Sequence, residues 1–127
     1  VKVSFKEKIR MIKKTYNMPF LRFHTIDPVK LAEISREMTD RLQEIIGCPR
    51  EHIVLEVIHS EIVTDGQIGQ GDWPFIEVAY FERSLEIQDG VAHIICQYLK
   101  QVGYENVDIH FSYLSNRNYY ENGNCSQ

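Results

Sequence analysis

Hydrophobic and polar positions recur with two different periods along the chain. Together they predict four strands and two helices in the order β-α-β, β-α-β. Aromatic and β-branched residues gather in four runs, which predict strands at 19–26, 52–63, 75–82 and 107–114. Apolar residues at helical spacing between these runs predict two amphipathic helices. The first apolar stripe is Leu31, Ile34, Met38, Leu42 and Ile45, and the second is Ile87, Val91, Ile94, Ile95, Tyr98 and Val102.

Both predicted helices carry boundary signals. Asp27 can accept from the free N–H groups at the start of the first helix, and Pro28 suits its first turn. Gly47 is placed to end that helix. Ser84 and Gly103 fill the same two roles for the second helix.

The two halves of the chain look alike, since PFLRF at 19–23 opens one and PFIEV at 74–78 opens the other. Each motif is followed by a capped helix that ends in glycine and then by another strand. We therefore expect an α/β (α+β) fold, in which two β-α-β units form a four-stranded sheet with two helices on one face. The other face would be uncovered although its strands are rich in apolar residues, which favours association with another chain.

Two further segments are predicted to lack regular structure. Residues 64–73 contain three glycines, but no helix follows them directly, so a long hairpin connection is favoured over a phosphate-binding loop. Residues 116–127 are predicted to form a polar tail.

Charge divides the chain of 127 residues near its start. Residues 1–17 hold six basic residues and one acidic residue, a net charge of +5, whereas residues 18–127 hold eight basic and 17 acidic residues, −9. We therefore predict a basic extension over 1–17 and one domain over 18–127. The extension suits an amphipathic helix that docks on a membrane or partner. The favoured alternative is sequence upstream of a later start, or a helix resting on its own protein.

The bulk properties also exclude several partners. The acidic domain argues against nucleic acid. No apolar run approaches the ~20 residues that cross a bilayer, so we expect a cytoplasmic protein without a membrane partner. The three cysteines have no paired spacing and the strand histidines no metal-ligand spacing, so neither a disulfide framework nor a metal site is predicted.

Charged side chains interrupt strands that otherwise look buried. Arg22, Glu56 and Glu77 each lie mid-strand, and an unpaired buried charge is very costly. They are therefore expected to pair with one another or to face a wet pocket, as an ion-pair network or as ligand-binding groups. Arg83 follows the third strand, where it could clamp a carboxylate or simply be a solvated loop residue.

Three segments carry a resemblance to a known family. They are MPFLRF at 18–23, GCPREHIVLEVI at 47–58 and NYYENG at 118–123. In this order and spacing they resemble the tautomerase superfamily, in particular the macrophage migration inhibitory factor branch and an uncharacterised bacterial subgroup of it. The similarity spans residues 18 to about 123.

The resemblance implies a function and a site. In that superfamily the initiator methionine is removed, and the exposed proline amine acts as a general base in keto–enol tautomerisation. This implies Pro19 as the catalytic residue, and Arg83, Arg22, Glu56, Glu77 and Tyr119 as substrate-binding residues. It also implies a homotrimer without cofactor, acting on a small carbonyl or carboxylate-bearing ligand.

Two departures qualify what the resemblance implies. Cys48 stands where the migration-factor branch has a lysine, so the cation would have to come from Arg83 or Arg22. Pro19 is internal here, and a proline nitrogen within the chain is an amide without a basic lone pair. Either translation starts at Met18, or residues 1–17 are removed, or the protein is not such an enzyme. The alternatives are a non-catalytic homotrimeric binding protein of the same fold and a monomeric ferredoxin-like binding module.

Overall fold

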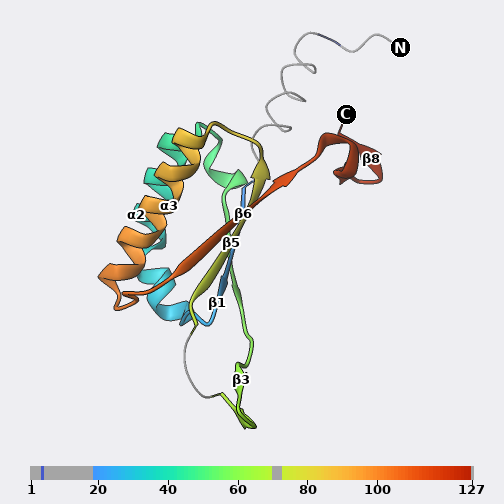
Figure 1. Ribbon diagram of the computed structural model, residues 1–127. Coiled ribbons are helices and arrows are strands. Elements are labelled where there is room, and N and C mark those ends of the chain that lie inside the picture. Colours follow the sequence, from blue (N-terminus) through green and yellow to red (C-terminus); the bar gives the residue numbers. More distant parts are fainter. Residues whose placement is uncertain (1–3, 5–18, 70–72, 127) are drawn as a thin grey trace.

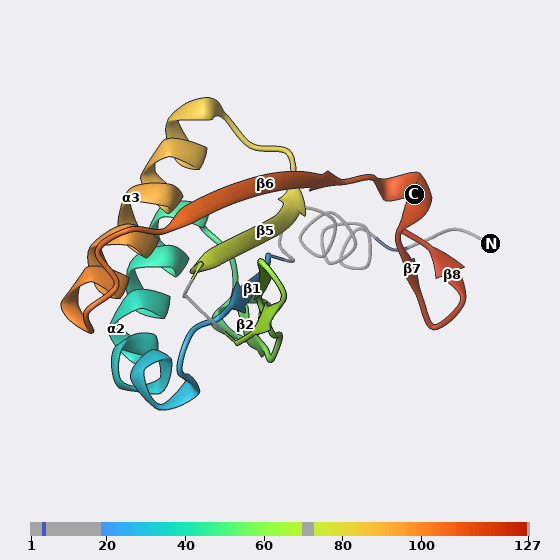
Figure 2. The same ribbon diagram turned by 60° about the horizontal axis from the view of Figure 1, so that its bottom comes forward.

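The computed structural model describes residues 4, 19–69 and 73–126. A four-stranded sheet in the order β2-β1-β5-β6 carries two helices on one face (Figure 1). Its strands are β1 (Phe20–His24), β2 (Val54–Ile58), β5 (Phe75–Phe81) and β6 (Asp108–Leu114), and its helices are α2 (Pro28–Ile46) and α3 (Leu85–Gln101). The predicted fold class is confirmed. Figure 2 shows the same two layers after a turn about the horizontal axis.

Strand pairing confirms that the chain consists of two β-α-β units. β1 runs parallel to β2, and β5 runs parallel to β6. The two units meet where β1 pairs with β5 in antiparallel orientation, with Arg22 opposite Glu77. Because β1 and β5 are antiparallel and β6 is parallel to β5, the start of β1 and the ends of β5 and β6 lie at the same end of the sheet.

The core fills the layer between sheet and helices. From β1, Leu21 and Phe23 point into it and are fully buried, and every second residue of β5 does the same. The helices contribute one apolar stripe each, as amphipathic periodicity requires. The buried helix residues are Leu31, Ile34, Met38, Leu42, Ile46, Val91, Ile94, Ile95, Tyr98 and Leu99.

Three predicted caps are confirmed, Asp27, Ser84 and Gly47, whereas α3 ends at Gln101 with Val102 as its C-cap and Gly103 one residue later. The Asp27 carboxylate accepts from the Val29 N–H at 2.8 Å, and the Ser84 hydroxyl accepts from the Ile87 N–H at 3.2 Å. Gly47 ends α2 in the left-handed conformation with φ of 74°.

The second strand is shorter than predicted. β2 ends at Ile58, and Val63–Thr64 (β3) instead pairs with Gln67–Ile68 (β4) in a separate hairpin that projects from the sheet (Figure 1). Asp65 and Gly66, both with positive φ, form the two-residue turn. A turn that closes locally withdraws these residues from the main sheet, so the predicted long strand divides.

The predicted polar tail is also structured. A short 3₁₀ turn, η2 (Asn116–Asn118), leads into a hairpin of β7 (Tyr120–Glu121) and β8 (Asn124–Cys125), with Asn122-Gly123 at the turn. A second 3₁₀ turn, η1 (Arg50–His52), links α2 to β2. The predicted extension, residues 1–17, lies outside the described residues apart from Ser4. Neither described helix is long and apolar enough to cross a membrane.

Candidate functional site

Four residues from three separate segments of the chain lie at one end of the sheet. Pro19 immediately precedes β1, Tyr80 lies near the end of β5, and Arg83 follows β5. The residue pairing between β1 and β5 continues outward from Phe20 opposite Ala79, which brings Pro19 beside Tyr80. Helix α2 runs back to this same end of the sheet, so Cys48, two residues after the helix, also lies there. We call Pro19, Cys48, Tyr80 and Arg83 the proline-end cluster.

Pro19 is fully buried in the described structure. Its carbonyl oxygen accepts a hydrogen bond from the Val54 N–H at 3.2 Å, which ties the start of β1 to the start of β2. In any chain that retains residue 18, its nitrogen is an amide and has no proton-accepting lone pair. Pro19 can therefore act as a base only after the peptide bond that precedes it has been cleaved.

Arg83 is a partly buried cation beside Pro19's neighbour Tyr80. Its Nη1 donates to the Phe81 carbonyl oxygen at 2.8 Å, and its guanidinium carbon lies 5.3 Å from the centre of the Tyr80 ring. Burial lowers the pKa of Arg83, while nearby Cys48 and Tyr80 act in the opposite direction. A guanidinium remains charged under such a shift, so the site keeps a positive charge.

Tyr80 was not among the residues that the sequence singled out. Its side chain is 0% exposed, and its hydroxyl has no hydrogen-bond partner among the described residues. Burial raises the pKa of Tyr80 to about 12, helped by neighbouring Tyr113 and opposed by Arg83. A sequence signal does exist, because Tyr80 is the last inward-facing position of an alternating strand and precedes a possible ligand arginine by three residues.

Cys48 occupies the position where the resemblance implies a lysine. Its thiol is buried, and burial raises its pKa, an effect that nearby Arg83 opposes. A cation, Arg83, therefore lies close to Cys48, on the loop after β5 rather than at the end of α2.

Arg22, Glu56 and Glu77 form a row on the other face of the sheet. Arg22 stands directly opposite Glu56 on one side and Glu77 on the other. No ion pair joins Arg22 to either glutamate in the described part of the chain, and Glu77 instead accepts from His24 Nε2 at 2.5 Å. The structure therefore brings the three residues together on the uncovered face but separates them from the proline-end cluster.

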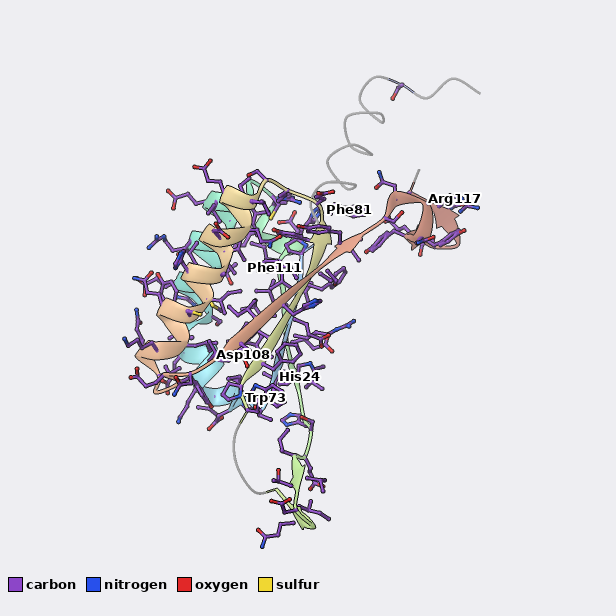
Figure 3. All side chains as sticks on the ribbon, viewed as in Figure 1. His24, Trp73, Phe81, Asp108, Phe111 and Arg117 are labelled. Atoms are coloured by element: carbon purple, nitrogen blue, oxygen red, sulfur yellow. The ribbon has the colours of Figure 1, made fainter. Side chains whose placement is uncertain are left out.

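Tyr119 lies close to the end of β5 but on a different element from the cluster. Its ring packs edge-on against Phe81, with 5.7 Å between the ring centres. Figure 3 shows Phe81 at this end of the sheet, with His24, Trp73 and Asp108 at the opposite end. Tyr119 therefore contacts Phe81, which is not a member of the proline-end cluster.

A groove elsewhere on the surface holds no candidate residue. It has a volume of about 430 Å³ and lies between α2 and β2. Its lining consists of Pro28, Leu31, Ala32, Ser35, Thr39, Ile53, Leu55 and Val57. With only two hydroxyls and no ionisable group, it offers little chemistry. Within the described ranges, no cluster of three metal-ligating side chains is found either.

Comparison with known proteins agrees with this architecture. The family described as "Domain of unknown function (DUF1904)" matches residues 18–125. A DUF1904 domain from Sebaldella termitidis shares 29% sequence identity and a TM-score of 0.76, covering 84% of this chain and 97% of that one. No curated protein matches the chain significantly.

Two more distant structures share the fold. A macrophage migration inhibitory factor-like protein from Entamoeba histolytica is 22% identical with a TM-score of 0.64, covering 84% of this chain and 97% of that one. Fused 4-OT, described as an asymmetric trimer, is 13% identical with a TM-score of 0.69, covering 84% and 95%. The chain therefore belongs to the DUF1904 family, and its fold is that of the tautomerase superfamily.

Proposed function

We propose that this protein, when Pro19 is its first residue, moves a proton on a carbon next to a carbonyl in a small carbonyl- or carboxylate-bearing ligand. The observation that supports this is the proline-end cluster, in which a proline that can become a secondary amine and a partly buried arginine both neighbour Tyr80. Likeness of fold alone would not carry the proposal, since one fold hosts many functions.

The proposed chemistry is a keto–enol tautomerisation. A free proline amine has its ordinary pKa above neutrality, and an apolar, cationic setting disfavours its protonated form, bringing the base toward the working pH. The amine would take the proton from the enol oxygen or from the carbon, and return one to the other position. Arg83 would bind the negative oxygen that develops, or the carboxylate of the ligand.

A chain that begins at Pro19 should convert a phenylpyruvate-like enol to its keto form, whereas the chain from Val1 should be inert or far weaker. Only the shorter chain has a proline nitrogen with a lone pair. The measurement is enol absorbance against time for both chains. Pro19→Ala in the shorter chain retains a primary amine, so it should weaken the rate rather than abolish it. Equal rates in the two chains would rule out the proline mechanism.

Assembly as a homotrimer belongs to the same proposal. The uncovered sheet face carries Phe20 and Phe75 together with the charged row, and the related fused 4-OT is described as a trimer. We expect light scattering at micromolar concentration to give the mass of three chains. In such an assembly Arg22 would find its carboxylate partner across a subunit boundary. A mass of one chain at that concentration would contradict the assembly and leave the charged row exposed to solvent.

A non-catalytic binding protein of the same fold is the second candidate. It is favoured by the full burial of Pro19 and by its carbonyl's bond to Val54, which suit a structural proline. No turnover by the chain that begins at Pro19, together with ligand binding at the proline-end cluster, would select this candidate.

A further inference from the structure

We propose that Tyr80 is a ligand-binding residue: its hydroxyl donates a hydrogen bond to a carboxylate oxygen of a small organic acid whose charge is balanced by Arg83. The inference deepens the proposed function because it concerns the same site. It does not depend on turnover, since a binding protein would use the same two groups.

The first argument is the cost of the hydroxyl as it stands. A buried hydroxyl without a partner loses its hydrogen bonds to water and gains none in return. Only two buried side-chain polar atoms in the described ranges lack a partner, and Tyr80 Oη is one of them. Phenylalanine would fill the same space without this cost. A bound molecule that accepts a hydrogen bond from this hydroxyl would remove the cost.

The second argument is that the ring is held in place. Tyr80 packs against Phe111 with 5.6 Å between ring centres, and stacks on Tyr113 with 6.2 Å and an interplanar angle of 15°. Tyr113 is itself anchored, because its hydroxyl donates to Gln88 Oε1 on α3 at 2.7 Å. A donor that the surrounding rings already orient loses little conformational freedom when it binds a ligand.

The third argument concerns the chemical class of the ligand. A phenol keeps its proton throughout the physiological range, and burial raises the pKa of Tyr80 further, to about 12, so the hydroxyl needs an acceptor. The adjacent guanidinium, whose carbon lies 5.3 Å from the ring centre, favours an anion over a neutral amide. Helix α3 also begins at this end of the sheet and adds the positive end of its dipole. A phenol and a guanidinium can each donate to one oxygen of a carboxylate.

The test is calorimetric binding to the full 127-residue chain, with probes that cannot tautomerise to an enol acid. Phenylacetate is the carboxylate probe, phenylacetamide its neutral counterpart, and inorganic phosphate the alternative anion. We expect phenylacetate to bind at least about tenfold more tightly than either of the others. Tyr80→Phe should weaken phenylacetate binding about tenfold, the effect of losing a hydrogen bond to a charged group.

The matched control is Tyr98→Phe. Tyr98 is a second buried tyrosine, but it lies roughly 20 Å along α3 from the residue that caps the helix near Arg83. This variant should bind phenylacetate like the parent chain. Without ligand, Tyr80→Phe should melt at the same temperature as the parent chain or higher, because it removes an unsatisfied hydroxyl. A lower melting temperature would show that the hydroxyl already has a partner in the protein, which overturns the inference.

The remaining outcomes separate this inference from the proposed function. Failure of the parent chain to bind phenylacetate, or equal binding by the parent and Tyr80→Phe, overturns the role of Tyr80. Tighter binding of phosphate than of phenylacetate overturns the ligand class. If binding depends on Tyr80 but the chain that begins at Pro19 shows no tautomerase activity, the inference is supported and the proposed catalytic function is wrong.

Discussion

Replacing Arg83 with alanine in a chain that begins at Pro19 is expected to lower kcat/KM for a phenylpyruvate-like enol by about 100- to 1,000-fold. The guanidinium is the cation of the proline-end cluster, half-buried and beside Tyr80, where an electrostatic contact is stronger than in water. Its loss leaves a developing oxyanion or a bound carboxylate without a counter-charge. Steady-state kinetics on the purified variant measure the effect.

Two companion variants show whether the effect belongs to the site. Arg83→Lys keeps the charge but not the planar fork, so its activity should lie between those of alanine and arginine. Arg22→Ala removes the other candidate cation, which lies on the opposite face of the sheet and in the charged row. A larger loss from Arg22→Ala than from Arg83→Ala, at unchanged oligomeric mass, would move the site to the uncovered face.

Replacing Leu21 with alanine is expected to lower the free energy of unfolding by about 2–5 kcal/mol. Leu21 is 0% exposed and stands in a central strand, between Leu55 of β2 and Val78 of β5. Truncation there leaves a cavity that strands on both sides prevent from collapsing. Since small domains have about 5–15 kcal/mol in total, the loss is a large fraction, and a urea titration followed by circular dichroism detects it.

Leu85→Ala is the matched control for that substitution. It deletes the same atoms, but Leu85 is 69% exposed in the first turn of α3, so the expected change is within about 0.5 kcal/mol. Both variants are to be compared at one protein concentration, because assembly would couple stability to concentration. Similar losses at the two positions would mean that the layer between sheet and helices is not the main source of stability.

Local signals in the sequence were enough to predict the frame of this fold. Asp27 and Ser84 cap the helices because their side chains bond to backbone groups two or three residues away, and Gly47 ends a helix through its own backbone freedom. The two similar halves also predicted the two β-α-β units. Each of these features depends on neighbours in sequence or on periodicity, so no knowledge of distant contacts was needed.

The two short hairpins were only partly predictable from the sequence. Asp65-Gly66 and Asn122-Gly123 are strong turn signals, yet the long apolar run into Val63 favoured one continuous strand, and the tail looked merely polar. In both segments the turn residues determine the structure, because a turn with positive φ at both positions closes the chain locally. When these turn signals are given priority over hydrophobicity, the sequence predicts both hairpins.

The sequence by itself determined which elements form, and it marked Pro19, Arg83 and the charged row as unusual. Only the tertiary structure decided which of these residues meet. Arg22, Glu56 and Glu77 align because of the strand register, while Pro19 joins Tyr80, Arg83 and Cys48 because β1 and β5 run antiparallel and α2 returns to the same end. The sequence marks Tyr80 only by its place at the end of an alternating strand, because its buried hydroxyl becomes conspicuous only when the described residues around it hold no acceptor. Local bonding sets the elements, whereas the site depends on contacts between residues about 30–60 positions apart in the chain, which only packing brings together.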